Sequence, residues 1–157
     1  MTLALTGAML FIGIFAAIIG LLVVVMPLMY RTFATGSGYA ELARRFPASH
    51  VPDGRRYDWQ SIRLGAVRWR RCATMIFSPE GLYLSFMPAM PVLGKPQFNH
   101  HPAVLIPWAE MKSATPATLY WQRAVAISLG EPTVAVLAIY QPFFSLIEPY
   151  TSLRVAG

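Results

Sequence analysis

The first apolar segment of the chain runs from Leu3 to Tyr30 and contains no charged residue. Every lysine and arginine follows it, beginning with Arg31. At about 1.5 Å per residue, a helix over this segment would reach roughly 42 Å, whereas about 20 apolar residues suffice to cross a hydrocarbon core of about 30 Å. The pattern therefore predicts a single transmembrane anchor at residues 3–30.

A cleaved signal peptide is the alternative for this segment, but it requires a basic start and a small-residue cleavage site. Only Met1 and Thr2 precede the segment, and it ends in Met29, Tyr30 and Arg31. We therefore expect a retained, single-pass anchor. Because basic residues concentrate on the cytoplasmic side of a membrane, the arginines after the anchor predict an N-terminus outside and a C-terminal domain in the cytoplasm.

The next segment, residues 31–58, is expected to hold a juxtamembrane helix and a loop. Its apolar positions, Tyr39, Leu42, Ala43 and Phe46, are spaced i, i+3, i+4 and i+7, which predicts one apolar face on a short helix. Ser37 is the expected N-cap. We expect the helix to lie along the membrane or against the following domain, and residues 47–58, rich in turn-forming and polar residues, to form a loop.

From residue 59 to residue 157 the pattern changes to short alternating or compact apolar runs, which are typical of strands. Pro107 can start a short helical turn, and the last apolar segment, 142–153, is expected to be a closing helix. Strands are predicted at residues 61–67, 73–77, 82–86, 103–106, 118–129 and 133–139. Turn signals at 78–81 and at 130–132 join them into two hairpins.

Residues 124–147 are apolar enough to be tested as a second membrane span. Glu131 near its middle would cost about 2.5 to 3.5 kcal/mol, and Gly130, Pro132 and Pro142 would interrupt a lipid-exposed helix. We therefore interpret this segment as part of a β-hairpin.

Two stretches carry a resemblance. Residues 77–84 (FSPEGLYL) and, after a loop, residues 104–111 (VLIPWAEM) resemble the strand, turn, strand and IPW-x-x-I pattern of small bacterial membrane-anchored proteins with PH-like or GRAM-like β-domains. Met111 stands where isoleucine is usual. The resemblance implies a strongly bent antiparallel sheet with a closing helix. Together with the anchor, the expected fold is a single N-terminal transmembrane helix plus a mainly-β, PH-like domain of antiparallel strands with short helices, located at the bacterial inner membrane. The resemblance implies no catalytic residue, and such folds serve many roles.

The residues offer little chemistry. Gly36-Ser37-Gly38 lacks the lysine and spacing of a phosphate-binding loop, and the seven acids form no obvious pair. His100 and His101 are the best metal candidates, but adjacent residues of an extended chain point to opposite sides and no third ligand lies at a suitable spacing. Cys72, the single cysteine, lies in an apolar stretch and is expected to be buried. We expect no enzyme, cofactor or metal; a hydrolase or metalloenzyme would need a pocket joining a histidine to distant acids.

The net charge of +6 is concentrated, since eight of the thirteen basic residues lie between Arg44 and Arg71. Such residues can contact anionic headgroups, or they can simply keep a domain soluble and follow the positive-inside bias. Nucleic acid is a disfavoured partner because the anchor already explains the bias. The candidate headgroup contacts are Arg31, Arg44, Arg45, Arg63, Arg68, Arg70 and Arg71.

Two apolar features could contact other proteins. In the anchor, Gly13, Ala16, Ala17 and Gly20 form a smooth helix face of the kind against which another span can pack. In the apolar loop after residue 86, exposed side chains would mark a partner or membrane contact, although the loop could equally cover the domain's own core. The candidate contacts in this loop are Met87, Met90, Val92 and Leu93.

Two functions fit these features. The first is a non-catalytic accessory or scaffold subunit of a larger inner-membrane complex, respiratory or photosynthetic for example, with membrane lipids and other membrane-protein subunits as partners. The second is a PH-like sensor that binds anionic lipid headgroups or another small ligand.

Overall fold

The computed structural model describes residues 13–21, 24–25, 36–86 and 102–155. The chain separates into two compact units, Met1–Phe33 and Ala34–Gly157. In the first unit, residues 13–21 are helical. No helix among the described residues combines the length and the apolar character needed to cross a membrane. The span predicted at residues 3–30 is therefore not confirmed, and most of it lies outside the described residues.

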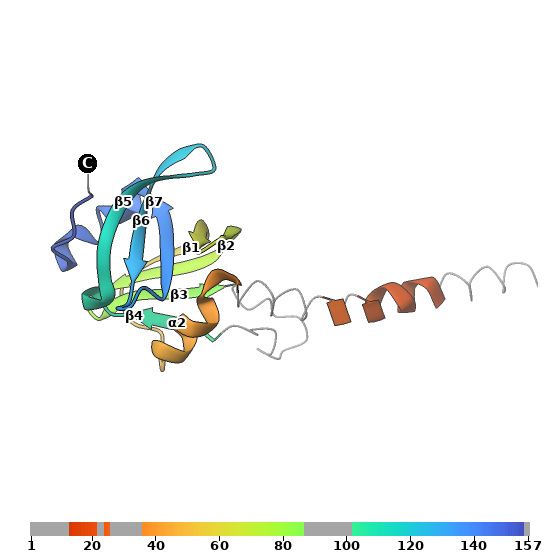
Figure 1. Ribbon diagram of the computed structural model, residues 1–157. Coiled ribbons are helices and arrows are strands. Elements are labelled where there is room, and N and C mark those ends of the chain that lie inside the picture. The colour runs from red at the N-terminus through yellow and green to blue at the C-terminus, as the bar shows by residue number, and fades with distance from the viewer. Residues whose placement is uncertain (1–12, 22–23, 26–35, 87–101, 156–157) are drawn as a thin grey trace, which may run out of the picture. The chain divides into compact units, whose positions relative to one another are not determined.

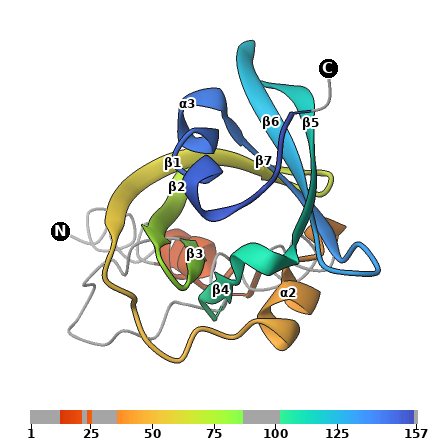
Figure 2. The ribbon, with the colours of Figure 1, turned by 90° about the vertical axis from the view of Figure 1, so that its left-hand side faces the viewer.

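The second unit is built on one seven-stranded antiparallel sheet in the order β4-β3-β2-β1-β7-β6-β5 (Figure 1). Its strands are β1 Arg55–Leu64, β2 Val67–Ser78, β3 Gly81–Phe86, β4 Val104–Ile106, β5 Met111–Leu119, β6 Gln122–Leu129 and β7 Ala135–Tyr140. The sheet curves into a half-barrel (Figure 2), because β1 pairs with β2 over most of its length and reaches β7 only at Arg63 and Leu64. The mainly-β, antiparallel prediction is confirmed.

One apolar cluster fills the concave side of the sheet. It forms because alternate residues of each strand point inward, as Ile62 and Leu64 do in β1 and Ile127 and Leu129 do in β6, all fully buried. Their removal from water is the main stabilising term for a domain of this size. The outward residues between them are therefore the ones available for contacts.

Helix α2, Tyr39–Arg45, packs against this cluster through Tyr39, Leu42 and Ala43. The Tyr39 ring meets Phe86 edge to face at 4.8 Å, and its hydroxyl donates to the carbonyl of Pro102 at 2.6 Å. Of the two predicted positions for this helix, the one against the domain is therefore observed. The N-cap prediction needs correcting.

The N-cap of α2 is Gly38, not Ser37, because the backbone there has a φ of 76° that glycine adopts without strain. Ser37 still contributes, since its hydroxyl accepts a hydrogen bond from the Tyr39 N–H at 3.2 Å. Phe46 lies just beyond the last helical turn and packs partly buried against the core.

Several strand boundaries differ from the predicted ones. The predicted strand 61–67 is interrupted, because Gly65 adopts a φ of 55° and, with Ala66, turns the chain from β1 into β2. The predicted strand 118–129 is likewise broken by a turn at Tyr120 and Trp121. The predicted loop 47–58 ends early, since β1 already begins at Arg55 and pairs with the far end of β2.

The two predicted hairpin connections are confirmed. Ser78 and Gly81 are paired at the β2–β3 turn, and residues 130–134 join β6 to β7. Residues 124–140 therefore form a β-hairpin, followed by a short helix, and not a second span. Pro107 does begin a helical turn, the 3₁₀ helix η1 at Trp108–Glu110. The closing segment forms two short helices in place of the single predicted one, α3 Gln141–Phe144 and η2 Glu148–Tyr150, and Pro149 lies in the first turn of the second, where proline is tolerated.

Other segments of the chain contact both edge strands of the sheet, β4 and β5. Along β4, the N–H of Leu105 donates to the carbonyl of Phe46 at 3.0 Å, and the N–H of Ala48 donates to the carbonyl of Ala103 at 2.9 Å. On β5, Ala114 pairs with Val155 in a parallel bridge. Exposed strand edges are templates for aggregation, and these contacts shield the edge at β4 and one position of the edge at β5.

Candidate functional site

The β1–β2 hairpin places two arginines side by side on the outer face of the sheet. Arg63 and Arg68 are direct cross-strand partners. Their neighbours Ile62 and Trp69 belong to the core cluster, so by strand alternation Arg63 and Arg68 point outward. Like charges directly opposite each other are destabilising. The pair therefore favours a nearby anion.

A bulge brings two more arginines to this face. Arg71 has a φ of 49°, and its N–H, displaced from the regular ladder, donates to the hydroxyl of Ser61 at 3.0 Å. The irregularity lies where the register between β1 and β2 shifts, and it leaves Arg70 and Arg71 both exposed. We refer to Arg63, Arg68, Arg70 and Arg71 as the arginine face.

The ion pairs of the described segments lie away from the arginine face. Five carboxylates pair with basic groups elsewhere: Glu41 with Arg44, Glu110 with Arg45, Glu80 with His50, Asp58 with Arg56 and Glu131 with Lys112. Within the described ranges, no carboxylate lies within 4.0 Å of a guanidinium of the arginine face or of Arg123. The same holds for Arg55 and Arg154, so what distinguishes the arginine face is that four such arginines lie together on one face of the sheet.

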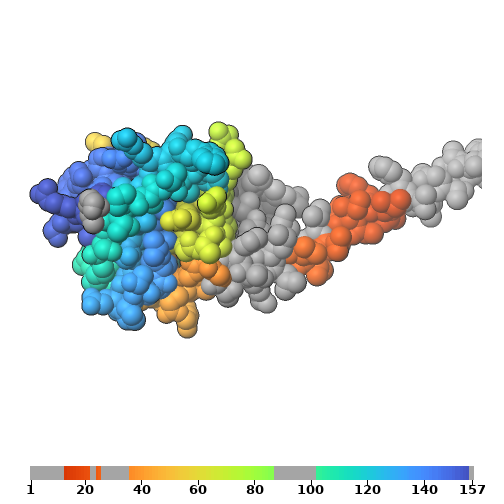
Figure 3. Space-filling view, turned by 45° about the horizontal axis from the view of Figure 1, so that its top comes forward, coloured from red at the N-terminus to blue at the C-terminus, as the bar shows by residue number. Residues whose placement is uncertain are grey.

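The tip of the β5–β6 hairpin lies beside the arginine face. Tyr120 and Trp121 form the turn, and the Trp121 side chain is 98% exposed. The guanidinium carbon of Arg70 lies 5.9 Å from the centre of the Tyr120 ring, within cation–π range. In the space-filling view this hairpin, in cyan, lies beside the yellow-green of β2 (Figure 3). One exposed ring, that of Trp121, one half-buried ring, that of Tyr120, and the arginine face therefore share one region.

The sequence prediction missed this tip. Tyr120 and Trp121 are typical strand residues, so the apolar run 118–129 predicts one continuous strand. The only signal was the sequence Gln122-Arg123 directly after the aromatic pair, which breaks the apolar run.

An open hollow of about 560 Å³ lies next to the tip, lined by Gln122, Arg123, Tyr140, Gln141, Pro142, Phe143 and Ser145.

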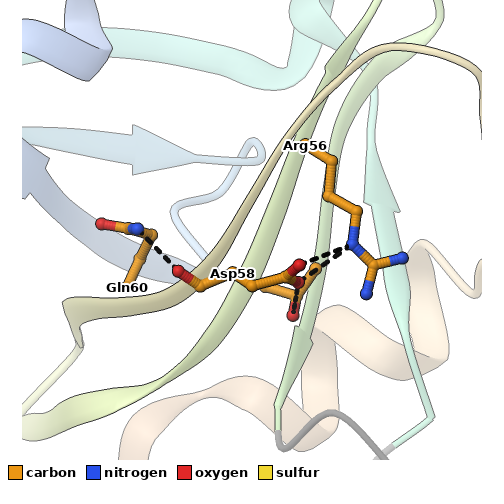
Figure 4. A network of polar contacts seen from close by, with 4 residues as sticks. Arg56, Asp58 and Gln60 are labelled. Carbon is orange, nitrogen blue, oxygen red and sulfur yellow. Dashed lines mark hydrogen bonds and ion pairs between the residues drawn. The ribbon is translucent and has the colours of Figure 1, made fainter.

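A polar network holds the bend of β1 (Figure 4). The carboxylate of Asp58 accepts hydrogen bonds from the Thr74 hydroxyl at 2.7 Å and from Arg56 Nε at 2.9 Å, and the Gln60 amide donates to the Asp58 carbonyl at 2.7 Å. The hydrogen bond from Thr74 lowers the pKa of Asp58, and Arg56 lowers it further. Between Asp58 and Gln60, Trp59 takes a φ of 58° and is 56% exposed. The network is thus a structural clamp.

The other predicted contacts are not brought together here. Arg44 pairs with Glu41 on α2, whereas Arg45 donates to the carbonyl of Glu131 at 3.2 Å and lies 3.7 Å from Glu110. Arg31, Met87, Met90, Val92 and Leu93 lie outside the described residues, as do His100 and His101. Gly13, Ala16, Ala17 and Gly20 are exposed on the helical residues 13–21.

The remaining candidate chemistry is sparse in the described segments. Cys72 is half-buried, and burial raises the pKa of its thiol. Over those segments, no three His, Cys, Asp or Glu side chains lie close enough together to hold a metal ion. No protein-family model matches the chain, and no curated protein matches its sequence.

Proposed function

We propose that the protein is a non-catalytic, membrane-anchored protein of the bacterial inner membrane whose PH-like cytoplasmic β-domain binds anionic lipid headgroups through the arginine face. The observation that carries the proposal is the gathering of four arginines on one face of the sheet, none with a described carboxylate within 4.0 Å. Two of them, Arg63 and Arg68, face each other across a strand pair. Each basic side chain near an anionic membrane surface contributes about 1 kcal/mol.

The PH-like assignment draws support from the strand order and from the short closing helices α3 and η2. A contact between the β1–β2 turn and the start of the domain supports headgroup binding. A Cβ on Gly65, in the β1–β2 turn, would lie 2.8 Å from the carbonyl oxygen of Ser37. The turn between the two facing arginines therefore packs on the first residues of the domain, which follow the proposed anchor.

The test uses the full chain in lipid nanodiscs, either neutral or containing anionic phosphatidylglycerol. Arg68→Gln/Arg70→Gln removes two charges from the arginine face, and Arg55→Gln/Arg154→Gln removes two exposed charges elsewhere as the matched control. We expect anionic lipid to raise the unfolding temperature of the wild-type protein and of the control, and added salt to reduce this gain.

The Arg68→Gln/Arg70→Gln variant should lose most of the gain, since two contacts of about 1 kcal/mol each correspond to roughly 30-fold in the equilibrium between bound and free domain. Equal unfolding temperatures in neutral and anionic discs would contradict headgroup binding.

The second candidate function is the accessory or scaffold subunit of a larger membrane complex. The observation that favours it is the exposed small-residue face Gly13, Ala16, Ala17 and Gly20, where nothing lies within 4 Å of a Cβ built on Gly13 or on Gly20. Such a face lets another helix approach closely. Purification from native membranes in mild detergent should then yield a stable complex, and a protein that migrates alone as a monomer would exclude this function.

A further inference from the structure

The turn between β5 and β6 has an unusual composition for its geometry. Leu119 and Gln122 are paired, so Tyr120 and Trp121 are the two central residues of a two-residue hairpin turn, with φ values of 47° and 67°. A turn with positive φ at both centres favours Asn-Gly or similar pairs, because bulky residues are strained there. A strained conformation kept by two large aromatic residues points to a role for their side chains.

Trp121 is exposed to a degree that the fold does not require. Trp69 and Trp108 are buried and contribute to the core cluster, whereas Trp121 is 98% exposed at the end of a protruding hairpin. Arg70 lies over Tyr120, and Arg123 follows the turn. Over the described ranges neither arginine has a carboxylate within 4.0 Å. The tip therefore combines an amphipathic ring with unneutralised positive charge.

We propose that this tip inserts into the interfacial zone of an anionic bilayer, with the Trp121 indole at the boundary of headgroups and acyl chains and with Arg70 and Arg123 at the lipid phosphates. The inference rests on the proposed headgroup binding and adds the element that penetrates. Trp and Tyr are enriched at this depth of membranes because one part of the ring is apolar and another is polar.

A bilayer fits the tip better than a protein partner does. Stable protein interfaces bury about 800 Å² on each partner around a packed centre. A narrow hairpin tip carrying one fully exposed ring and adjacent cations offers little flat surface, but it suits the soft, negatively charged boundary of a membrane.

The experiment places the full chain in anionic nanodiscs whose acyl chains carry bromine, which quenches nearby tryptophans. The emission of the wild-type protein should fall by about one quarter relative to unbrominated discs, since Trp121 is one of four tryptophans. The Trp121→Phe variant should lose this quenched component. The control Trp59→Phe, which removes the partly exposed tryptophan of the β1 bend, should keep it.

A second variant separates function from folding. Tyr120→Asn/Trp121→Gly installs the residues that the turn prefers, so its unfolding temperature should equal or exceed that of the wild-type protein while the quenching disappears. Equal quenching in this variant and in the wild-type protein would overturn the insertion of the tip.

The outcomes distinguish this inference from the proposed headgroup binding. If anionic lipid still stabilises the domain through Arg68 and Arg70 while Trp121 stays unquenched, the tip does not insert and headgroup binding stands. If Trp121 is quenched equally in neutral and in anionic discs, the tip inserts without the arginines, and headgroup binding fails. Shielding of Trp121 in native membranes but not in pure lipid would mean a protein partner and would refute insertion.

Discussion

Tyr39 provides a test of how burial and ionisation combine in the core. Its hydroxyl donates to the Pro102 carbonyl at 2.6 Å, and burial, with Tyr83 nearby, raises the pKa of Tyr39 well above its ordinary value. Tyr39→Phe removes the hydroxyl and keeps the ring against Phe86. A hydrogen bond of this kind contributes about 1 kcal/mol net, so the variant should be less stable by that amount at pH 8.

The difference should change sign in alkali. A group whose pKa is raised by folding contributes stability below its unfolded pKa, and this contribution is lost as the pH rises above that value. At pH 11 the unfolded Tyr39, with a pKa near 10, is mostly ionised, which stabilises the unfolded state by about 1.4 kcal/mol, whereas the folded Tyr39 stays protonated. The free energies of unfolding of the wild-type protein and of Tyr39→Phe should therefore cross between about pH 10.5 and pH 11.

The assay is urea unfolding of the full chain in mild detergent, followed by tryptophan emission from pH 8 to pH 11. The Tyr140→Phe variant, which removes a half-buried tyrosine at the end of β7, is the control for loss of one hydroxyl. A difference between wild-type protein and Tyr39→Phe that stays constant over this range would refute the reasoning.

Three further predictions concern single sites. Gly65→Ala places a Cβ 2.8 Å from the Ser37 carbonyl oxygen at a φ of 55°, so it should lower the free energy of unfolding by about 1 to 3 kcal/mol in urea titrations; an unchanged midpoint would count against this packing. The lowered pKa of Asp58 contributes stability above about pH 4 that is lost as the pH falls through its folded value, and Asp58→Asn should flatten this acid limb of the stability profile. Because burial raises the pKa of Cys72, iodoacetamide at pH 8 should modify it much more slowly in the folded protein than in urea, and similar rates would argue against its burial.

The strands were predictable where both alternation and turn chemistry were visible. Ser78-Pro79-Glu80-Gly81 marks its own turn, and Gly130 and Pro132 mark another. The turn at Tyr120 and Trp121 was invisible because its residues have high strand propensity and no turn preference. The start of β1 falls in the predicted loop because residues 47–58 are turn-forming and polar, although Arg56 and Asp58 lie on the solvent side of a strand whose Tyr57 packs against the core.

The sequence predicted a basic surface, but not which arginines would lie on it together. The concentration of basic residues indicated a charged surface, but only the register shows that Arg63 faces Arg68. Arg45 looked equivalent in the sequence, yet it is engaged by Glu110 and by the Glu131 carbonyl, both more than sixty positions away. Such long-range pairing depends on how the sheet curves, and a local pattern carries no information about it.

The protection of the outer strands limits how this domain can associate with other polypeptides. Phe46 and Ala48 occupy backbone groups beside β4, and Val155 occupies one beside Ala114. At β4, a strand donated by another chain would first have to displace the segment around Phe46 and Ala48, which exchanges existing backbone hydrogen bonds for new ones with little net gain. Other polypeptides are therefore not expected to extend the sheet at β4. Recognition by exposed side chains, such as those of the hairpin tip and the arginine face, is favoured in its place.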